Sequence, residues 1–126
     1  MLCMPDVWFD DDAFEQLLNY VNSSKGAYAP NTERARLSDS RIFAEWCQDE
    51  RRKMLPSRPE TIAAFIDTMA ETRAPATVRR YATSISHLHR AAGLTNPCND
   101  ELVRLALRRM HRAKGRRGQS EARPDP

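Results

Sequence analysis

The sequence lacks the features that mark several protein classes. Its three cysteines, Cys3, Cys47 and Cys98, are scattered among 126 residues, and no two have C-x-x-C spacing. This pattern argues against a disulfide framework and a zinc site, and it fits a reducing compartment. No apolar run approaches the ~18 residues that cross a bilayer, and no basic-then-apolar start indicates a secretory signal. We therefore expect a cytoplasmic protein with no membrane contact.

Acidic residues are missing from one long stretch, between Ala74 and Leu94. Within it, apolar residues recur at spacings of three and four and predict one amphipathic helix. A solvated helix face normally mixes both signs of charge. A face of hydroxyls and arginines instead suits phosphates and base edges in a major groove, although a solvated face that is basic by chance stays an alternative. The polar residues of this stretch are Thr77, Arg79, Arg80, Thr83, Ser84, Ser86, His87 and Arg90.

The net charge of +3 is small but unevenly distributed along the chain. Residues 1–22 hold five acidic residues and neither lysine nor arginine, whereas residues 101–123 hold eight basic residues and two acidic ones. This asymmetry favours a polyanionic partner, or contact between the two ends.

Apolar periodicity predicts five helices joined by short loops, and no segment alternates like a half-buried strand. The expected fold class is therefore all-α, a compact bundle of four to five helices. The helices should cover about residues 10–22, 31–50, 59–72, 75–93 and 100–114. We expect residues 1–26 to form an N-terminal arm and a first acidic helix. Residues 27–115 should form the helical domain and residues 116–126 a basic, disordered tail.

Few side chains indicate chemistry of their own. His87 and His89 are two residues apart, so they lie on different helix faces and cannot share a metal as an i, i+4 pair can. We interpret His89 as a core-edge histidine with satisfied hydrogen bonds and Trp46 as a core anchor, whereas for His87 a phosphate contact and solvation both stay open. Without a glycine-rich phosphate loop, paired carboxylates or a Ser/His/Asp order, we assign no catalytic residue, metal or cofactor.

Four segments follow one another in a recognisable order along the chain. Trp46 and Cys47 near the end of the second helix are followed by a proline-initiated helix, PETIAAFIDTM. Then comes PATVRRY…LHRAAGL, the most specific portion, and after it a helix that ends in basic residues. This order resembles the N-terminal core-binding domain, a SAM-like fold, of tyrosine recombinases, the phage-integrase family. The resemblance covers roughly Ala27 to Arg117.

The resemblance implies a domain that grips one side of double-stranded DNA through its second and fourth helices. A catalytic domain, joined by a linker, would close on the other side. The DNA contacts implied by position are Thr32, Arg34, Ser38 and Arg41 from the second helix and Thr77, Arg79, Arg80, Thr83, Ser84 and Arg90 from the fourth, with Arg116 and Arg117 beginning the basic linker.

Three further expectations follow from the resemblance. The first helix would pack against the fifth helix of a neighbouring protomer on DNA, whereas the free domain would be a monomer. The protein would be bacterial or phage-derived and associated with the nucleoid. Tyr20, Tyr28 and Tyr81 lack the groups that support a nucleophilic tyrosine, so we assign no catalysis to the chain. We favour a piece of a longer recombinase over a stand-alone relative that lost the catalytic half. A non-enzymatic helical module for protein–protein interaction, with no nucleic-acid role, stays the alternative.

Overall fold

Proline opens three of the long helices of this chain. It lacks an N–H group and its φ is fixed near the helical value, so it suits the first position of a helix. The computed structural model describes residues 11–122, and the side chains of residues 15, 16, 18–20 and 22–114. The elements are α1 (Asp11–Ser23), α2 (Pro30–Glu50), α3 (Pro59–Met69), α4 (Pro75–Ala91), the 3-10 helix η1 (Pro97–Asn99) and α5 (Glu101–Ala122).

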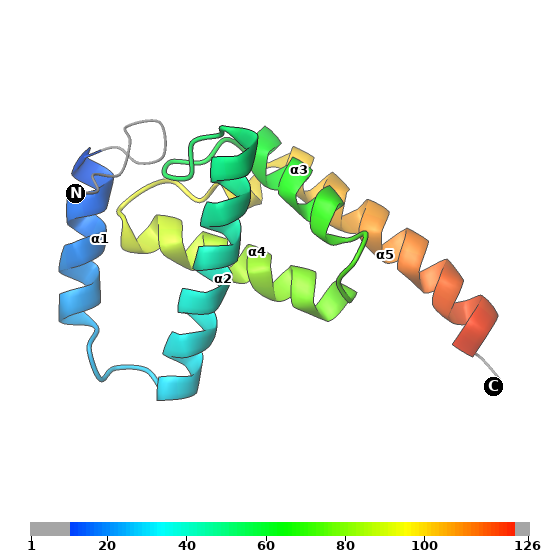
Figure 1. The fold of residues 1–126 in the computed structure, drawn as a ribbon, viewed down its shortest axis with the longest axis horizontal. Coiled ribbons are helices and arrows are strands. Elements are labelled where there is room, and N and C mark those ends of the chain that lie inside the picture. Colours follow the sequence, from blue (N-terminus) through cyan, green and yellow to red (C-terminus); the bar gives the residue numbers. More distant parts are fainter. Residues whose placement is uncertain (1–10, 123–126) are drawn as a thin grey trace.

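α2 and α4 form a crossed pair, α3 and α5 form a second pair, and α1 lies at one side (Figure 1). α4 passes across the middle of α2, and α3 and α5 lie side by side. α1 reaches the rest of the domain mainly through α4. No strand occurs between residues 11 and 122, so the all-α bundle that the sequence predicts is confirmed.

Phe65 of α3 lies at the centre of the core. Its ring contacts Phe43 and Trp46 of α2 at centroid distances of 5.0 and 5.3 Å, and Tyr81 of α4 at 5.8 Å. The two contacts with α2 are edge to face, and the contact with Tyr81 is tilted. Aromatic contacts of this kind add to the free energy that the buried area itself contributes. The aromatic cluster therefore fixes α2, α3 and α4 against one another, and Trp46 is a core anchor as predicted.

Two side chains of types that often do chemistry, a thiol and an imidazole, are buried in the core. Cys47 is buried, and burial raises the pKa of its thiol to about 12, which makes it unreactive. His89 is fully buried, accepts a hydrogen bond at Nε2 from the N–H of Ser57 (2.9 Å) and makes one at Nδ1 with the carbonyl of Ile85 (2.9 Å). The prediction of a satisfied core histidine is confirmed.

Some helix ends and faces differ from the sequence prediction. α5 continues past Lys114 to Ala122, because a glycine inside a helix costs only about 1 kcal/mol and the Arg, Gln and Glu around Gly115 favour helix. α3 ends at Met69, before Thr72. On α5, Leu102 and Leu105 are both exposed, since only a narrow stripe through Val103 faces the core.

Within residues 11–122, no helix combines the length and the apolar composition that a membrane crossing requires. The predicted division of the chain at residues 26 and 115 stays a prediction.

Candidate nucleic-acid interface

The crossing of α2 and α4 is built around a buried aspartate. Asp39 of α2 is 1% exposed, and Arg80 of α4 donates to both of its oxygens, from Nε at 3.1 Å and from NH2 at 2.8 Å. The hydroxyl of Ser84, one turn further along α4, donates to the same carboxylate at 2.6 Å. Charge-assisted bidentate contacts are among the stronger hydrogen bonds in proteins. They fix the guanidinium at the helix crossing.

Arg80 is nevertheless available to a ligand. Its side chain is 53% exposed although it is bonded to a buried partner. A guanidinium carries five N–H groups, and Asp39 uses two of them, on the Nε–NH2 edge. The NH1–NH2 edge therefore keeps two donors that can bind a phosphate or a base edge. The hydrogen bond and the charge of Asp39 raise the pKa of Arg80, so its charge is permanent.

Asp39 is the functional residue that the sequence reading missed. Asp39, Phe43 and Cys47 follow one another at intervals of four, so they share one helix face, and that face is buried. An aspartate in register with an apolar stripe needs a buried partner, and this spacing was the available signal.

The other predicted contacts of α4 occupy its outer surface. Arg79, Thr83 and Arg90 are exposed, and Thr77 is half-buried. Thr83 donates its hydroxyl to the carbonyl of Arg79 at 3.1 Å. Ser84 differs from the rest: it is 5% exposed and bonded to Asp39, so its hydroxyl acts inside the domain.

The predicted contacts of α2 also lie on the surface, whereas the side chains of the predicted linker contacts, Arg116 and Arg117, lie outside the described part of the chain. Thr32, Arg34, Ser38 and Arg41 are all exposed. They follow the first half of α2, the half that ends where Asp39 meets α4. The backbone of residues 116 and 117 belongs to α5, and their side chains lie outside the described part.

A ring of polar aromatic groups connects α1 to this interface. Arg36 of α2 donates to Nε2 of His87 at 3.2 Å and lies 4.5 Å from the ring centroid of Tyr28. The rings of Tyr20 and His87 meet edge to face at 5.3 Å. Burial first, then the charges of Arg36 and Arg90, lower the pKa of His87. His87 therefore stays neutral at pH 7 and accepts from Arg36, rather than presenting a cation to a phosphate.

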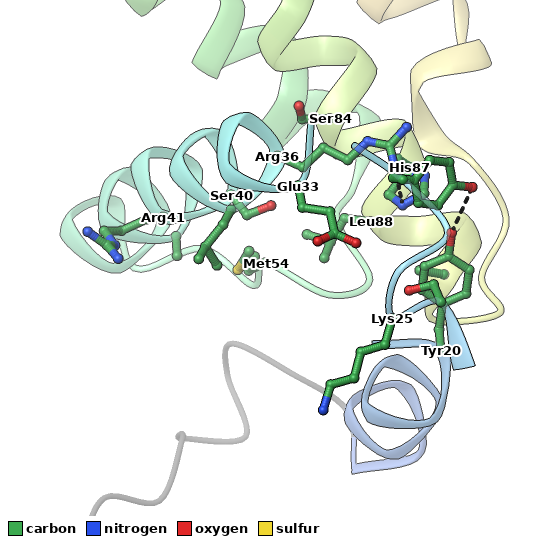
Figure 2. Close-up of a pocket in the computed structure, with 15 residues that line it drawn as sticks. Tyr20, Lys25, Glu33, Arg36, Ser40, Arg41, Met54, Ser84, His87 and Leu88 are labelled. Carbon is green, nitrogen blue, oxygen red and sulfur yellow. Dashed lines mark hydrogen bonds between the residues drawn. The ribbon is translucent and has the colours of Figure 1, made fainter. Parts of the chain in front are cut away.

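These residues border a largely apolar groove of about 540 Å³ between α1, α2 and α4. Figure 2 shows Tyr20, Arg36 and His87 together at one end of the groove and Arg41 at the other. Leu37, which lines it, is 62% exposed. Arg41 and Ser84 belong both to the groove lining and to the predicted DNA-contact residues of α2 and α4. The groove is largely apolar, whereas the DNA-contact residues are arginines, threonines and serines.

Comparison with known proteins shows which proteins this chain is similar to. No family model matches the chain. It is 40% identical over 97 residues to an integrase/recombinase XerD homolog from Selenomonas ruminantium, which covers 73% of this chain and 28% of that protein. It is 30% identical over 87 residues to the recombinase Cre of Escherichia phage P1, covering 68% of this chain and 25% of Cre.

This chain is related to the tyrosine recombinases. The resemblance seen in the sequence is thereby confirmed. The chain spans only about a quarter of the length of these two tyrosine recombinases, so the relationship rests on one part of each.

Proposed function

We propose that this chain is the double-stranded DNA-binding, core-binding domain of a site-specific tyrosine recombinase. α2 and α4 grip the duplex at their crossing, and the chemistry of strand cleavage belongs to a separate catalytic domain. The observation that carries the proposal is the arrangement of Arg80, on a helix without acidic residues. Buried Asp39 holds its Nε–NH2 edge, and its outer N–H edge has no hydrogen-bond partner among the described residues. The relationship to recombinases supports it.

The proposed contacts divide into two groups. Arg80 at the crossing reads a base edge or a phosphate with its free N–H edge, and a bidentate contact with guanine is worth about 1–3 kcal/mol of discrimination. The peripheral residues hold phosphates and position the protein on the duplex. They are Thr32, Arg34, Ser38 and Arg41 of α2, Thr77, Arg79, Thr83 and Arg90 of α4, and Arg116 and Arg117 beyond the domain.

Ser84 and Asp39 act through Arg80. Both are buried, so neither touches DNA in this arrangement. Asp39 holds the guanidinium in one orientation, and Ser84 satisfies a further lone pair of that carboxylate. A donor held in place before binding loses less conformational freedom when the complex forms. The buried pair thus prepares Arg80 for contact.

On DNA, protomers of the recombinase meet through α1 of one and α5 of its neighbour. The exposure of Leu18 on α1, and of Leu102 and Leu105 on α5, supports this part of the proposal, because each helix keeps apolar surface outside its own core. Free in solution, the domain is a monomer.

A second candidate function is a non-enzymatic module for protein–protein interaction. The observation in its favour is the apolar groove beside Leu37. The two functions differ in how binding responds to salt. Each neutralised phosphate contributes about −0.9 to the slope of log K against log salt concentration, whereas an apolar protein interface responds much less.

Fluorescence anisotropy of a labelled random duplex, titrated at several salt concentrations, tests the proposal. We expect weak binding with a slope of several units, because half of a two-domain clamp lacks the avidity of the whole. No binding near 50 mM salt, a concentration at which phosphate contacts are strong, would exclude DNA binding by this domain and leave the protein-interaction module.

A further inference from the structure

A second pocket, of about 660 Å³, lies where the connection after α2 meets the first turn of α3. None of its residues belongs to the predicted DNA-contact set. Four cations and one carboxylate line it, together with one hydroxyl. They are Arg51, Arg52, Lys53, Arg58, Glu60 and Thr61.

Thr61 supplies the observation that points to a ligand. It is 4% exposed, yet among the described residues its hydroxyl has no hydrogen-bond partner. Its backbone N–H is already satisfied by the carbonyl of Arg58 at 2.9 Å. A buried polar group without a partner costs about 1–3 kcal/mol, and most such groups in folded proteins have one. The hydroxyl of Thr61 can donate to a group that enters the pocket.

Three of the cations, Arg51, Arg52 and Lys53, follow directly after α2. Arg51 ends α2 in the left-handed region, with φ 58° and ψ 46°, at a position that usually carries glycine. The guanidinium of Arg52 lies 5.5 Å from the ring centroid of Trp46. Cations after α2 also favour the negative end of its dipole. That effect does not account for Arg58, which precedes α3, at the positive end of another helix.

We infer that this pocket binds a phosphate group. Arg51 and Arg58 supply charge-assisted hydrogen bonds, Thr61 donates its hydroxyl, and the N-terminal end of α3 adds a favourable dipole. Glu60 lies in the same wall and opposes the anion, so it limits the affinity. The phosphate belongs either to a nucleic-acid backbone or to a free phosphate ion. The inference does not rest on the proposed role of α2 and α4, because it uses other residues.

NMR spectroscopy of the 126-residue chain titrated with inorganic phosphate, at constant ionic strength in chloride, tests the site. We expect saturable amide shifts concentrated in residues 51–61. Replacement of Arg58 by alanine should raise the dissociation constant about tenfold, the effect of one charge-assisted hydrogen bond. The matched E60Q variant should lower it, because a like charge is removed. Shifts that do not saturate, or that equal those caused by chloride, would overturn the inference.

Thr61→Val separates a binding role from a structural one. Valine has nearly the same shape but no hydroxyl, so the variant should unfold at a higher temperature while its affinity for phosphate falls severalfold. A structural role for the hydroxyl would instead lower the unfolding temperature. Unchanged phosphate affinity in T61V would contradict the site.

A competition experiment identifies the source of the phosphate. If the duplex backbone supplies it, R58A should weaken duplex binding, and duplex and inorganic phosphate should displace one another from residues 51–61. If free phosphate is the ligand, R58A should leave the duplex affinity unchanged. Both results support a phosphate site. Duplex binding that changes in R58A without any saturable phosphate shift would count against it, since the arginine would then act only through long-range charge.

Discussion

Both carboxylate oxygens of Asp39 are used within the domain, whereas its partner Arg80 still reaches solvent. A buried anion thus holds an exposed cation, and the cation becomes a rigid feature of the surface. Removing either partner should affect the domain differently. Loss of Arg80 removes a ligand-binding group, and loss of Asp39 removes what orients that group.

Arg80→Ala should weaken DNA binding more than Arg104→Ala. Arg80 lies at the helix crossing, whereas Arg104 lies on α5, 65% exposed, with a single distant ion pair to Glu101 at 3.8 Å. The expected loss for R80A is about 1–3 kcal/mol, against well under 1 kcal/mol for R104A. Parallel anisotropy titrations of the two variants at one salt concentration measure the difference. Equal or reversed losses would contradict the placement of Arg80 in the interface.

Asp39→Asn should lower sequence discrimination while leaving the salt slope nearly unchanged. The amide has one acceptor oxygen instead of two, so Arg80 loses its fixed orientation but keeps its charge. The measurement is the ratio of affinities for a duplex selected from a randomised pool and for a random duplex. We also expect a loss of about 1–3 kcal/mol in the free energy of unfolding.

Glu33→Gln is the matched control for that experiment. It removes an exposed negative charge from the same helix without touching Arg80, so it should strengthen binding to both duplexes equally. A discrimination ratio that falls in E33Q as much as in D39N would show that net charge, not orientation, is responsible.

At the scale of elements, the contact between α1 and α4 depends on a glycine. Gly93 follows α4 with φ +75°, and a Cβ there would collide with the side chain of Gln16 of α1. Gly26 in the α1–α2 connection has a similar φ of +79° but open space around it. At both positions a side chain would be strained by the left-handed backbone. Only at Gly93 would the added Cβ also meet another side chain, that of Gln16.

Gly93→Ala should therefore destabilise the domain more than Gly26→Ala. Both substitutions incur roughly 1–2 kcal/mol of backbone strain, and G93A must also displace Gln16, whose side chain can move. Chemical denaturation of both variants gives the comparison. Equal losses would mean that Gln16 moves aside without cost and that α1 is only loosely attached.

Several elements could be predicted from local chemistry. The prolines at positions 30, 59 and 75 mark helix starts, and Gly93 marks a helix end because its positive φ suits glycine. The apolar stripe of α4 contains most of the residues of that helix that are buried, including Val78 and Tyr81. These features depend on neighbours in the sequence, so periodicity and turn chemistry suffice to find them.

Other features depend on contacts between distant segments. The partners of Asp39 lie more than 40 residues away, and the sequence therefore placed Ser84 on the outer face although it is buried. The phosphate pocket joins the end of one helix to the start of another. The exposure of Leu105 follows from which narrow strip of α5 meets α3. Helix periodicity alone contains none of this information.

At the scale of the whole molecule, stability should fall in mild acid. Burial lowers the pKa of His89 below its ordinary value of 6.5, against an opposing hydrogen bond to Ile85. Between the pKa of His89 in the folded chain and its pKa of about 6.5 in the unfolded chain, the unfolded chain binds more protons. The contribution of neutral His89 to the free energy of unfolding is therefore fully present above about pH 6.5 and decreases as the pH falls. Denaturation between pH 5 and 8 measures this slope.

The H89Q variant tests the assignment, because glutamine can accept from Ser57 and donate to Ile85 without titrating. It should flatten the slope, whereas H87Q, at a less buried position, should keep most of it. A slope that survives in H89Q would assign the pH dependence to other groups.

The central claim is that the surface of α2 and α4 binds duplex DNA, and an NMR map of amide shifts on adding an unlabelled duplex tests it most directly. At about 50 mM salt, where phosphate contacts are strong, we predict the largest shifts in residues 32–41 and 77–90. Shifts confined to the groove residues Tyr20, Lys25 and Tyr28, or no shifts at all, would contradict the claim.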